Sequence, residues 1–544
     1  MVRLKAIGLG LLAMGLSMTP VPAAETPQAL PLAASGETQG AATAAGVRQA
    51  FDPQASAGDY LKGRLRVTAG RFDLDLVDAE GRHLRRLAEG AGGVSDFQFV
   101  AERPDERLVV SAQEPGTYAL AIERKVAAAD QLAPPPDYLS PAIADMAAAL
   151  AAGRSTDAFW SMVAAKGTPL VEDGREGHRI VTFLGRGAKR NIRLFGAPSG
   201  DHEELQRLGA SDIWFRSFEV PDGTRLSYQL AFDVPDVPGT ARDRRIAILA
   251  TAKADPLNRH PWPADALDAY NQDSVLELAG APPQPWLAEN GSPAGTLERL
   301  SIESPVLGNR RNIAIYRPAG FDPADERTVL LFVFDADQYL ERVPVPRILD
   351  NMIAAGAVPP VVAVFIANPD REARARELPA NPVFADFMAK ELYPFVVKET
   401  GLAAPAARTV LAGSSYGGLA AVTVAMRHPE VFGNALSMSG SFWWSPPGTP
   451  EDRQEYVAGR IAAGEALSLR FFLAAGLFET GAHGTAGILD TSRHLRDVLE
   501  AKGIPVTYRD YAGGHDYLVW RGVLPDGLIA LFGESRLSLP EKHE

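Results

Sequence analysis

A G-x-S-x-G pentapeptide spans residues 413–417 and places Ser415 at its centre. An apolar run at 409–412 precedes it, and a helix-like stretch at 418–426 follows it. A strand, a tight turn and a helix in this order hold a serine in a strained backbone conformation with its hydroxyl exposed. We therefore predict that Ser415 is a nucleophile. Glycine is common, at 50 of 544 residues, so the pentapeptide alone is only a moderate signal.

An acid and a histidine follow Ser415 along the chain. An apolar run at 469–476 leads to Glu479, and a second run at 508–514 leads directly into His515. In such a site the histidine accepts the proton of the attacking hydroxyl, while the acid orients the imidazole and stabilises its cation. The order serine, acid, histidine is typical of α/β-hydrolases. The sequence thus predicts a catalytic triad of Ser415, Glu479 and His515.

Each partner also has a simpler interpretation. His515 after two glycines is compatible with an ordinary loop residue, and Glu479 with a solvated residue near a helix start. Asp490 competes for the role of the acid. We favour Glu479 because it follows its strand directly, whereas Asp490 lies inside a predicted helix at 488–502.

The elements around these residues predict an α/β fold for the C-terminal half. Strand signals alternate with helical segments and fall at 329–334, 361–366, 409–412, 435–438, 469–474 and 506–511. This alternation indicates a mostly parallel sheet covered by helices on both faces. We expect an α/β-hydrolase catalytic domain at 286–544, preceded by two smaller all-β, sandwich-like domains.

Short alternating runs predict the two all-β domains. The first, at 47–128, has a weak resemblance to the pre-peptidase C-terminal β-sandwich of exported bacterial enzymes. A helical connector at 129–170 leads to the second, at 171–285. Residues 25–46 are rich in Ala, Thr, Pro and Gly without apolar periodicity, which predicts a flexible lead-in.

The N-terminus has the pattern of a secretory signal peptide at 1–24. Arg3 and Lys5 precede an apolar stretch at 6–18, and Ala23-Ala24 offers a cleavage site. The stretch is too short for a comfortable bilayer span, so we expect an exported, periplasmic protein without membrane insertion. Cysteine is absent, which excludes disulfides and cysteine metal sites, and the net charge of −13 argues against nucleic acid as a partner.

Several stretches, in order and spacing, resemble the enterochelin (ferric enterobactin) esterase family. They lie at 374–381, 410–419, 428–430, 439–444 and 513–522, and the likeness covers roughly residues 140–533. The resemblance implies hydrolysis of the trilactone of ferric enterobactin or a related tricatecholate siderophore. Iron(III) is part of this small-molecule substrate, so no cofactor or metal site of the protein is expected. No obligate protein partner is implied either. The same three residues are implied as the triad.

The resemblance also implies an oxyanion hole. One N–H would come from Tyr416 and another from the loop containing Ala336 and Asp337. The family usually has glycine at the position of Ala336. Alanine tolerates positive φ less well, so the geometry of this loop is an open question at this point.

A ferric tricatecholate is triply negative and has broad aromatic faces. Arg374 and Arg521 would supply positive charge, and Trp443, Trp444 and Trp520 would line the cleft. The alternative is that the paired tryptophans belong to the core and that Arg521 pairs with a nearby acid.

Three rival functions share parts of this pattern. A feruloyl-type or other carboxylic ester hydrolase would have the same triad and fold. A periplasmic siderophore-binding protein with a vestigial site is disfavoured by the intact triad residues. A prolyl-oligopeptidase-like peptidase is disfavoured because the sequence upstream has no repeat of propeller-blade length.

Overall fold

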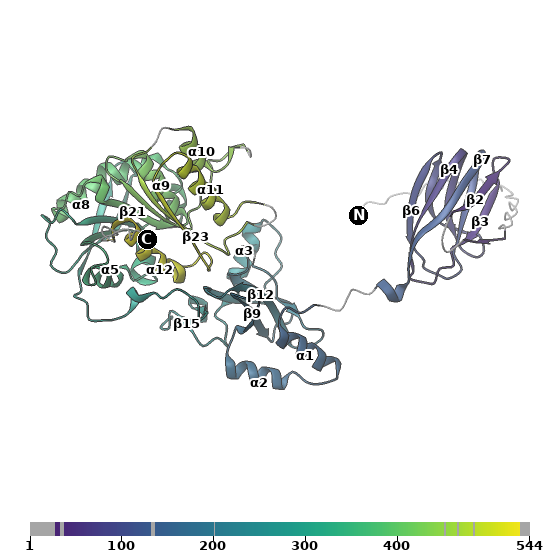
Figure 1. Ribbon diagram of the computed structural model, residues 1–544, viewed down its shortest axis with the longest axis horizontal. Coiled ribbons are helices and arrows are strands. Elements are labelled where there is room, and N and C mark those ends of the chain that lie inside the picture. Colours follow the sequence, from purple (N-terminus) through teal and green to yellow (C-terminus); the bar gives the residue numbers. More distant parts are fainter. Residues whose placement is uncertain are drawn as a thin grey trace, which may run out of the picture. The chain divides into compact units, whose positions relative to one another are not determined.

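The computed structural model describes residues 28–32, 37–131, 137–200, 202–450, 453–464, 467–481 and 485–533. The chain divides into two compact units, residues 1–136 and 137–544 (Figure 1). The predicted signal peptide at 1–24 lies outside the described residues. Every helix in the described part of the chain is too short or too polar to cross a bilayer.

The first unit is built on one seven-stranded sheet. Its strands are β1 (Leu30–Pro31), β2 (Thr38–Ala42), β3 (Arg48–Asp52), β4 (Tyr60–Val77), β5 (His83–Ala91), β6 (Val94–Val100) and β7 (Arg107–Val126), followed by the short helix η1 (Ala128–Gln131). The first half of β4 pairs with β6 and its second half with β5. Most register shifts between β4 and β7 fall between Val67 and Phe72, and such bulges bend a strand pair. The sheet thereby folds over around one apolar core.

The prediction of a flexible lead-in at 25–46 is wrong for its described strands. β2 pairs with β7 from Thr38 opposite Leu120 to Ala42 opposite Gly116, and β1 pairs with β3. These short strands carry little apolar periodicity of their own. Backbone hydrogen bonds to longer neighbouring strands order them, and composition does not reveal such bonds.

The second unit begins with helices and a two-sheet β domain, residues 170–277. Helices α1 (Pro141–Ala151) and α2 (Asp157–Lys166) pack on its outer sheet. That sheet has the order β11 (Gln206–Arg207), β12 (Ile213–Pro221), β9 (His178–Arg186), β8 (Leu170–Asp173). The inner sheet has the order β10 (Ile192–Gly196), β13 (Arg225–Phe232), β16 (Asp273–Glu277), β15 (Pro261–Trp262), with β14 (Ala252–Lys253) also on β13. Helices α3 (Ala241–Leu249) and η2 (Ala269–Asn271) complete the domain, and η3 (Pro285–Leu287) follows it.

The rest of the unit is the hydrolase domain, which has an eight-stranded sheet. In spatial order its strands are β17 (Thr296–Ser304), β18 (Asn309–Arg317), β20 (Val361–Ile366), β19 (Val329–Phe334), β21 (Thr409–Ser414), β22 (Asn434–Met438), β23 (Arg470–Gly476) and β24 (Val506–Tyr511). The last six are parallel, as the sequence predicts. The antiparallel hairpin β17–β18 at the edge was not anticipated from the sequence.

Helices cover both faces of this sheet (Figure 1). One face carries α4 (Ala336–Glu341), α5 (Val345–Ala354) and α12 (Tyr517–Phe532). The other carries α7 (Pro382–Phe387), η4 (Met388–Leu392), α8 (Tyr393–Thr400), α9 (Tyr416–Arg427), α10 (Tyr456–Ala463) and α11 (Ile488–Ala501). The short helices α6 (Arg371–Glu377) and η5 (Ala406–Arg408) lie in connections between strands.

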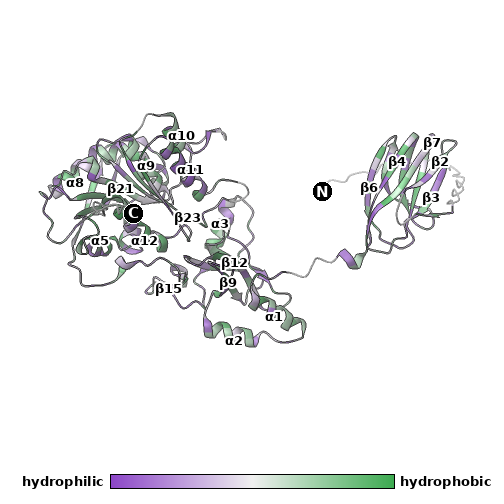
Figure 2. Ribbon diagram, in the orientation of Figure 1, coloured by the Kyte–Doolittle hydropathy of each residue, from purple (hydrophilic) through white to green (hydrophobic). Residues whose placement is uncertain are grey.

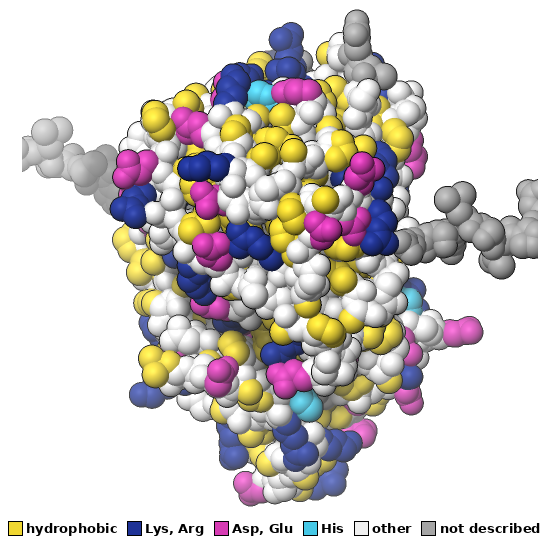
Figure 3. Space-filling model, turned by 90° about the vertical axis from the view of Figure 1, so that its left-hand side faces the viewer, with side chains coloured by type: hydrophobic (Ala, Val, Ile, Leu, Met, Phe, Trp, Pro, Cys, Tyr) yellow, Lys and Arg dark blue, Asp and Glu magenta, His cyan; other side chains and the backbone are white. Residues whose placement is uncertain are grey.

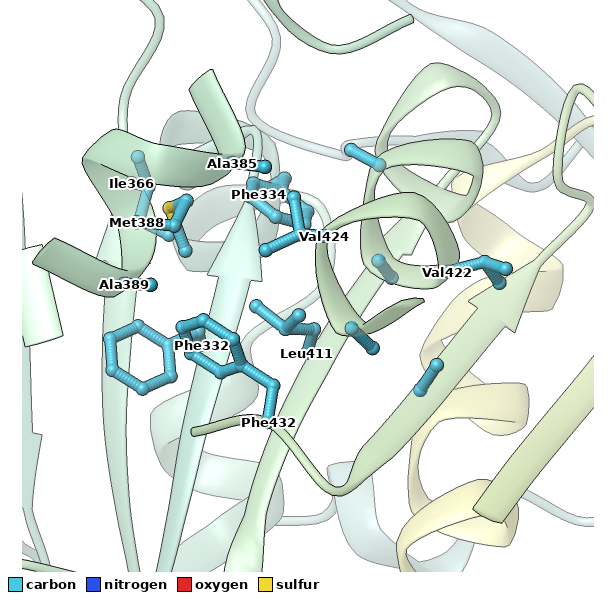
Figure 4. Packing of buried hydrophobic residues seen from close by; sticks show 14 of the residues in the cluster. Phe332, Phe334, Ile366, Ala385, Met388, Ala389, Leu411, Val422, Val424 and Phe432 are labelled. Atoms are coloured by element: carbon cyan, nitrogen blue, oxygen red, sulfur yellow. The ribbon is translucent and has the colours of Figure 1, made fainter. Parts of the chain in front are cut away.

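The central strands are buried along their whole length. Every residue of β19, β20 and β21 is buried, and β21 has the hydrophobic colour in Figure 2. A strand covered on both faces needs apolar residues at consecutive positions. Figure 4 shows how Phe332, Leu411 and Val424 fill the space between the strands and the covering helices.

The surface of the hydrolase domain is charged but mixed. The face in Figure 3 carries Lys and Arg side chains interspersed with Asp and Glu. This face is therefore not an extended field of one sign.

One ion pair in the hydrolase domain is fully buried. Arg311 Nη2 on β18 lies 2.6 Å from Glu377 Oε2 on α6, and the two side chains are 0% and 2% exposed. The guanidinium also lies over the ring of Phe387 at 4.7 Å. Removing one partner would leave an uncompensated charge in the core.

We expect Glu377→Gln to lower the free energy of unfolding by about 3 kcal/mol in urea denaturation. A matched control is Asp173→Asn, since Asp173 pairs with Arg179 but is 95% exposed. That variant is expected to change stability by less than about 0.5 kcal/mol. Equal effects of the two changes would contradict the structural importance of the buried pair.

Candidate active site

Ser415 occupies a sharp turn between β21 and α9. Its backbone has φ 58° and ψ −123°, a conformation that costs an L residue of order 1–3 kcal/mol. The flanking glycines permit the turn, because a Cβ on Gly413 would lie 2.6 Å from the carbonyl carbon of Gly417. The N–H of Ser415 donates to the carbonyl of Met438 at 3.1 Å, which ties the turn to β22. The local structure is the strand, turn and helix that the pentapeptide predicts.

Glu479 and His515 are joined by a short hydrogen bond. His515 Nδ1 lies 2.6 Å from Glu479 Oε1. The other carboxylate oxygen accepts the N–H of Gly476 at 2.6 Å, so both oxygens of this 2% exposed side chain have donors. The bond to Nδ1 leaves Nε2 of the imidazole available for proton transfer.

The competing acid, Asp490, has a different role. Its Oδ2 accepts the N–H of Gly487 at 2.9 Å and caps the start of α11. Glu479 is the acid in contact with the imidazole, in agreement with the preference drawn from its place after β23.

Ser415 and His515 line the same cavity, which has a volume of about 1350 Å³. The cavity lies between the β domain and the hydrolase domain, and Ala197 and Tyr228 of the β domain also line it. The Oγ of Ser415 lies 3.5 Å from the Oγ of Ser441, a distance at the outer limit of a hydrogen bond. The three residues of the predicted triad thus come from the carboxyl ends of β21, β23 and β24 and meet at one cavity.

The loop after β19 lies beside the start of α9. A Cβ on Gly417 would be 3.3 Å from Phe334 Cβ and 3.4 Å from Asp335 Oδ2. Two helices therefore begin near Ser415: α9 at Tyr416 and α4 at Ala336. The first N–H groups of a helix have no partner inside the helix and can point at an anion.

The substitution of alanine at position 336 is harmless for this loop. The positive φ of the loop, 59°, belongs to Asp335, and Ala336 is the first residue of α4. Three hydrogen bonds from two residues hold the side chain of Asp335. Its carboxylate oxygens accept hydrogen bonds from Nε and Nη2 of Arg374 at 2.7 and 2.8 Å, and from Nδ2 of Asn368 at 2.6 Å.

Of the five predicted substrate contacts, only Trp443 lines the cavity. It is 42% exposed and lies 6.2 Å from the ring of Tyr416. Arg374 does not line the cavity, because its guanidinium forms an ion pair with Asp335. Trp444 packs against Tyr456 and the core instead.

Trp520 and Arg521 also lie away from the cavity lining. Trp520 is buried and contacts the imidazole of His515 edge-on at 4.8 Å, while its Nε1 donates to Ser439 Oγ at 2.9 Å. It forms a wall behind the histidine. The Nε of Arg521 donates to Gln284 Oε1 at 2.7 Å, and burial, with nearby Arg225, lowers the pKa of its guanidinium. The core interpretation therefore holds for Trp444 but not for its neighbour Trp443, and Arg521 has an amide partner rather than an acid.

Two arginines that the sequence did not single out line the cavity. Arg245 on α3 lies over the ring of Phe195 at 5.3 Å, and Arg342 after α4 lies over Trp262 at 4.7 Å. Neither stands in a recognisable motif. Their partners are more than 45 residues away in the sequence, so only the folded chain brings each cation onto its ring.

Two further carboxyls line the cavity, the buried Asp516 and the partly buried Asp273. Burial raises the pKa of Asp516, and the hydrogen bond from Ser227 opposes this shift. Burial likewise raises the pKa of Asp273, opposed by Arg342, whose Nη1 lies 2.8 Å from its Oδ2. Among the described residues, His, Asp and Glu side chains form no group that could hold a metal ion.

Two family models match the second unit. A putative esterase model matches residues 304–531, and a model of the N-terminal part of enterochelin esterase matches residues 180–287. The seven-stranded sheet of the first unit lies outside both matches.

Relatives and solved structures cover the same region. The chain is 34% identical over 412 residues to an iron(III) enterobactin esterase of Dickeya dadantii, covering 68% of this chain and 92% of the relative. It is 30% identical over 417 residues to an iron(III) salmochelin esterase of Escherichia coli O6:H1, covering 72% and 98%. A ferric enterobactin esterase structure from Salmonella typhimurium matches with TM-score 0.57 and 29% identity, over 69% of this chain and 98% of that one. The chain therefore belongs to the iron(III) enterobactin esterase family.

Proposed function

We propose that this protein is a serine esterase that hydrolyses the backbone ester bonds of ferric enterobactin or a related tricatecholate siderophore. One observation carries the proposal: the Glu479–His515 pair and Ser415 open together into a cavity of about 1350 Å³. The related structure from Shigella flexneri, with TM-score 0.55 and 29% identity over 69% of this chain and 97% of that one, was determined in the presence of enterobactin.

In the first half of the reaction, Ser415 Oγ attacks the carbonyl carbon of an ester. Its proton passes to Nε2 of His515, and the carboxylate of Glu479 stabilises the imidazolium through Nδ1. The tetrahedral intermediate then collapses, and the C–O bond to the leaving alcohol breaks. His515 returns the proton to that oxygen. The alcohol product leaves, and an acyl group remains bound to Ser415.

In the second half, water attacks the acyl group. His515 takes a proton from the water, a second tetrahedral intermediate forms, and its collapse releases a carboxylic acid and restores the Ser415 hydroxyl. In a trilactone, one such cycle opens the ring. Each proton is moved by His515, so these steps use only groups of the chain, and iron(III) enters as part of the substrate.

The negative charge on the carbonyl oxygen needs donors at fixed positions. The N–H of Tyr416 and the N–H groups of Ala336 and Asp337 would supply them from the first turns of α9 and α4. Arg374 supports both sides of this hole. It donates two hydrogen bonds to Asp335, and its Cζ lies 5.9 Å from the centre of the Tyr416 ring.

The size and lining of the cavity favour a large anionic, aromatic ligand. Ligand pockets typically have volumes of about 300–1,000 Å³, so a simple aryl ester would fill only part of this one. Arg245 and Arg342 line it, each stacked on an aromatic ring, and Trp443 offers an exposed ring near Ser415. Planar guanidiniums and aromatic faces suit catecholate rings.

We also propose that the protein acts after export to the periplasm. The support is the N-terminal sequence, in which two basic residues precede an apolar stretch and Ala23-Ala24 offers a cleavage site.

Ser415→Ala is expected to lower turnover of ferric enterobactin by at least about 10⁴-fold, because no other group replaces the nucleophile. The dissociation constant, measured by quenching of protein fluorescence, should change by less than about threefold. Ser441→Ala is the comparison variant, since it removes a hydroxyl 3.5 Å from Ser415 Oγ but keeps the nucleophile, and its loss of turnover should be far smaller. Full turnover by Ser415→Ala would remove the nucleophile assignment.

Substrate choice can be tested separately with purified protein. The kcat/KM for ferric enterobactin is expected to exceed that for methyl ferulate by at least about 100-fold, because the small ester cannot reach both arginine–aromatic pairs. Product formation is followed by liquid chromatography. The opposite ranking would favour the feruloyl-type esterase.

Arg374→Ala tests whether this arginine positions the oxyanion hole or binds substrate. We expect kcat to fall by about 10–100-fold with KM within threefold, since a misplaced donor weakens binding of the transition state. Arg376→Ala is the control, because this arginine lies on the same helix and is 64% exposed. A rise in KM with unchanged kcat would return Arg374 to the substrate contacts.

A further inference from the structure

The catalytic groups fall into two sets with different supports. Ser415, Tyr416 and Ala336 lie at the ends of β21 and β19, inside the packing of the hydrolase domain. Glu479 and His515 lie on loops after β23 and β24, which we call the acid loop (477–480) and the base loop (512–516). Both of these loops contact the β domain.

The base loop is hydrogen-bonded to an edge of β13. The N–H of Arg225 donates to the carbonyl of Ala512 at 2.9 Å, and the N–H of Ser227 donates to Asp516 Oδ2 at 2.5 Å. β10 pairs with β13 only as far as Gly196 opposite Tyr228. Residues 225–227, which precede Tyr228 on β13, therefore have no strand partner on this side. The base loop forms hydrogen bonds there in place of a strand.

Two glycines allow this close approach. A Cβ on Gly513 would lie 2.9 Å from the carbonyl oxygen of Arg225, and a Cβ on Gly514 would lie 2.5 Å from Cβ of Ala197. Side chains at these positions would push the loop away from the β domain. The glycine pair before His515 thus has a packing reason that the sequence does not reveal.

The acid loop is attached to the β domain through Phe478. Its ring packs against the apolar core of the β domain, one residue before Glu479. The two loops are also tied to each other, because the N–H of Phe478 donates to the carbonyl of Gly513 at 3.1 Å. The β domain therefore contacts the residues on either side of the Glu479–His515 hydrogen bond.

We infer that the β domain fixes the acid–base half of the active site, and that Asp516 is a positioning residue for His515. Asp516 joins three elements: it follows His515 directly, its Oδ1 accepts the N–H of Leu518 at the start of α12, and its Oδ2 accepts the N–H of Ser227 in the β domain. This inference rests on the proposed esterase chemistry, and it gives the β domain a part in catalysis besides forming a wall of the cavity.

The variant Asp516→Asn isolates the contact between the domains. The two N–H groups bind different oxygens of the carboxylate, so an amide in the same orientation presents its NH2 group to one of them. The helix cap can be kept while the contact with the β domain is lost. Asp526→Asn is the matched control, since it makes the same charge change on the same helix and its carboxylate bonds the Tyr511 hydroxyl at 2.8 Å.

Activity is measured on ferric enterobactin and on p-nitrophenyl acetate, which is too small to depend on the cavity walls. For Asp516→Asn we expect kcat to fall at least about 10-fold on both substrates, with KM for the small ester within twofold. Asp526→Asn should stay within twofold of the parent on both. A loss confined to KM for ferric enterobactin would overturn the inference and leave the β domain as a substrate wall alone.

A second pair of variants acts from the other side of the contact. Ser227→Pro removes the donating N–H, whereas Ser227→Ala keeps it and removes the hydroxyl, which also hydrogen-bonds Asp516. Proline is expected to reproduce the loss seen with Asp516→Asn, and alanine, which keeps the N–H, is expected to cause a smaller loss than proline. Thermal unfolding of each variant shows whether it is folded. A folded Ser227→Pro enzyme with parental kcat on p-nitrophenyl acetate would also overturn the inference.

A spectroscopic readout separates this inference from the choice of substrate. The proton between His515 Nδ1 and Glu479 gives a low-field proton resonance, assigned by its absence in His515→Gln. We expect Asp516→Asn to broaden or remove the resonance and Asp526→Asn to retain it. An unchanged resonance in Asp516→Asn would contradict the positioning role. Failure to cleave ferric enterobactin, with this pattern and small-ester activity intact, would count against the proposed substrate only.

Discussion

The site depends on the hydrogen bond between Glu479 and His515, which joins residues 36 positions apart. A carboxylate this deeply buried is costly unless both of its oxygens have donors. The N–H of Gly476 satisfies one oxygen and the imidazole the other. The bond engages Nδ1 of His515 and leaves its other ring nitrogen, Nε2, for the proposed proton transfer. Without this contact the proposed base of Ser415 would lose the acid that orients it.

The order of the strands explains why these residues meet. β21, β22, β23 and β24 are consecutive neighbours in a parallel sheet, so their carboxyl ends lie along one edge. Ser415 comes from the first of these ends, Glu479 from the third and His515 from the loop after the fourth. Parallel strands about 4.8 Å apart set the spacing, but they do not orient loops several residues long. The β domain supplies that orientation through β13 and through the packing of Phe478 against its apolar core.

The sequence predicted the parts of this structure that local patterns encode. Buried parallel strands are continuous apolar runs, so β19 to β24 and the turn at Ser415 could be located closely. The hairpin β17–β18 was missed because its outer strand is largely exposed and carries polar residues. Strand β2 was missed because its order comes from β7 rather than from its own composition. Glu479 was preferred over Asp490 for its position after a strand, and the structure gives Glu479 the contact with His515.

The residues around the substrate cavity were harder to predict, because charge alone does not say where a side chain points. Arg374 stood in a family-like motif, yet its partner is Asp335, and the tryptophan beside His515 is a buried wall. Arg245 and Arg342 stood in no motif, and tertiary structure places them at the cavity. Their geometric partners, Phe195 and Trp262, are aligned only after the β domain has folded.

The charges around the cavity show how an acidic protein can accept an anionic ligand. At physiological ionic strength charges separated by more than about 8 Å are largely screened, so the net charge of −13 matters less than the groups at the cavity. The acids there are directed at donors of the protein: Glu479 at His515, Asp516 at two N–H groups and Glu455 at His494. Arg245 and Arg342 keep planar guanidinium faces against aromatic rings. The cavity therefore pairs its acids with donors of the protein, including Asp273 with Arg342, and places two guanidinium groups beside aromatic rings, an arrangement that suits a catecholate ligand.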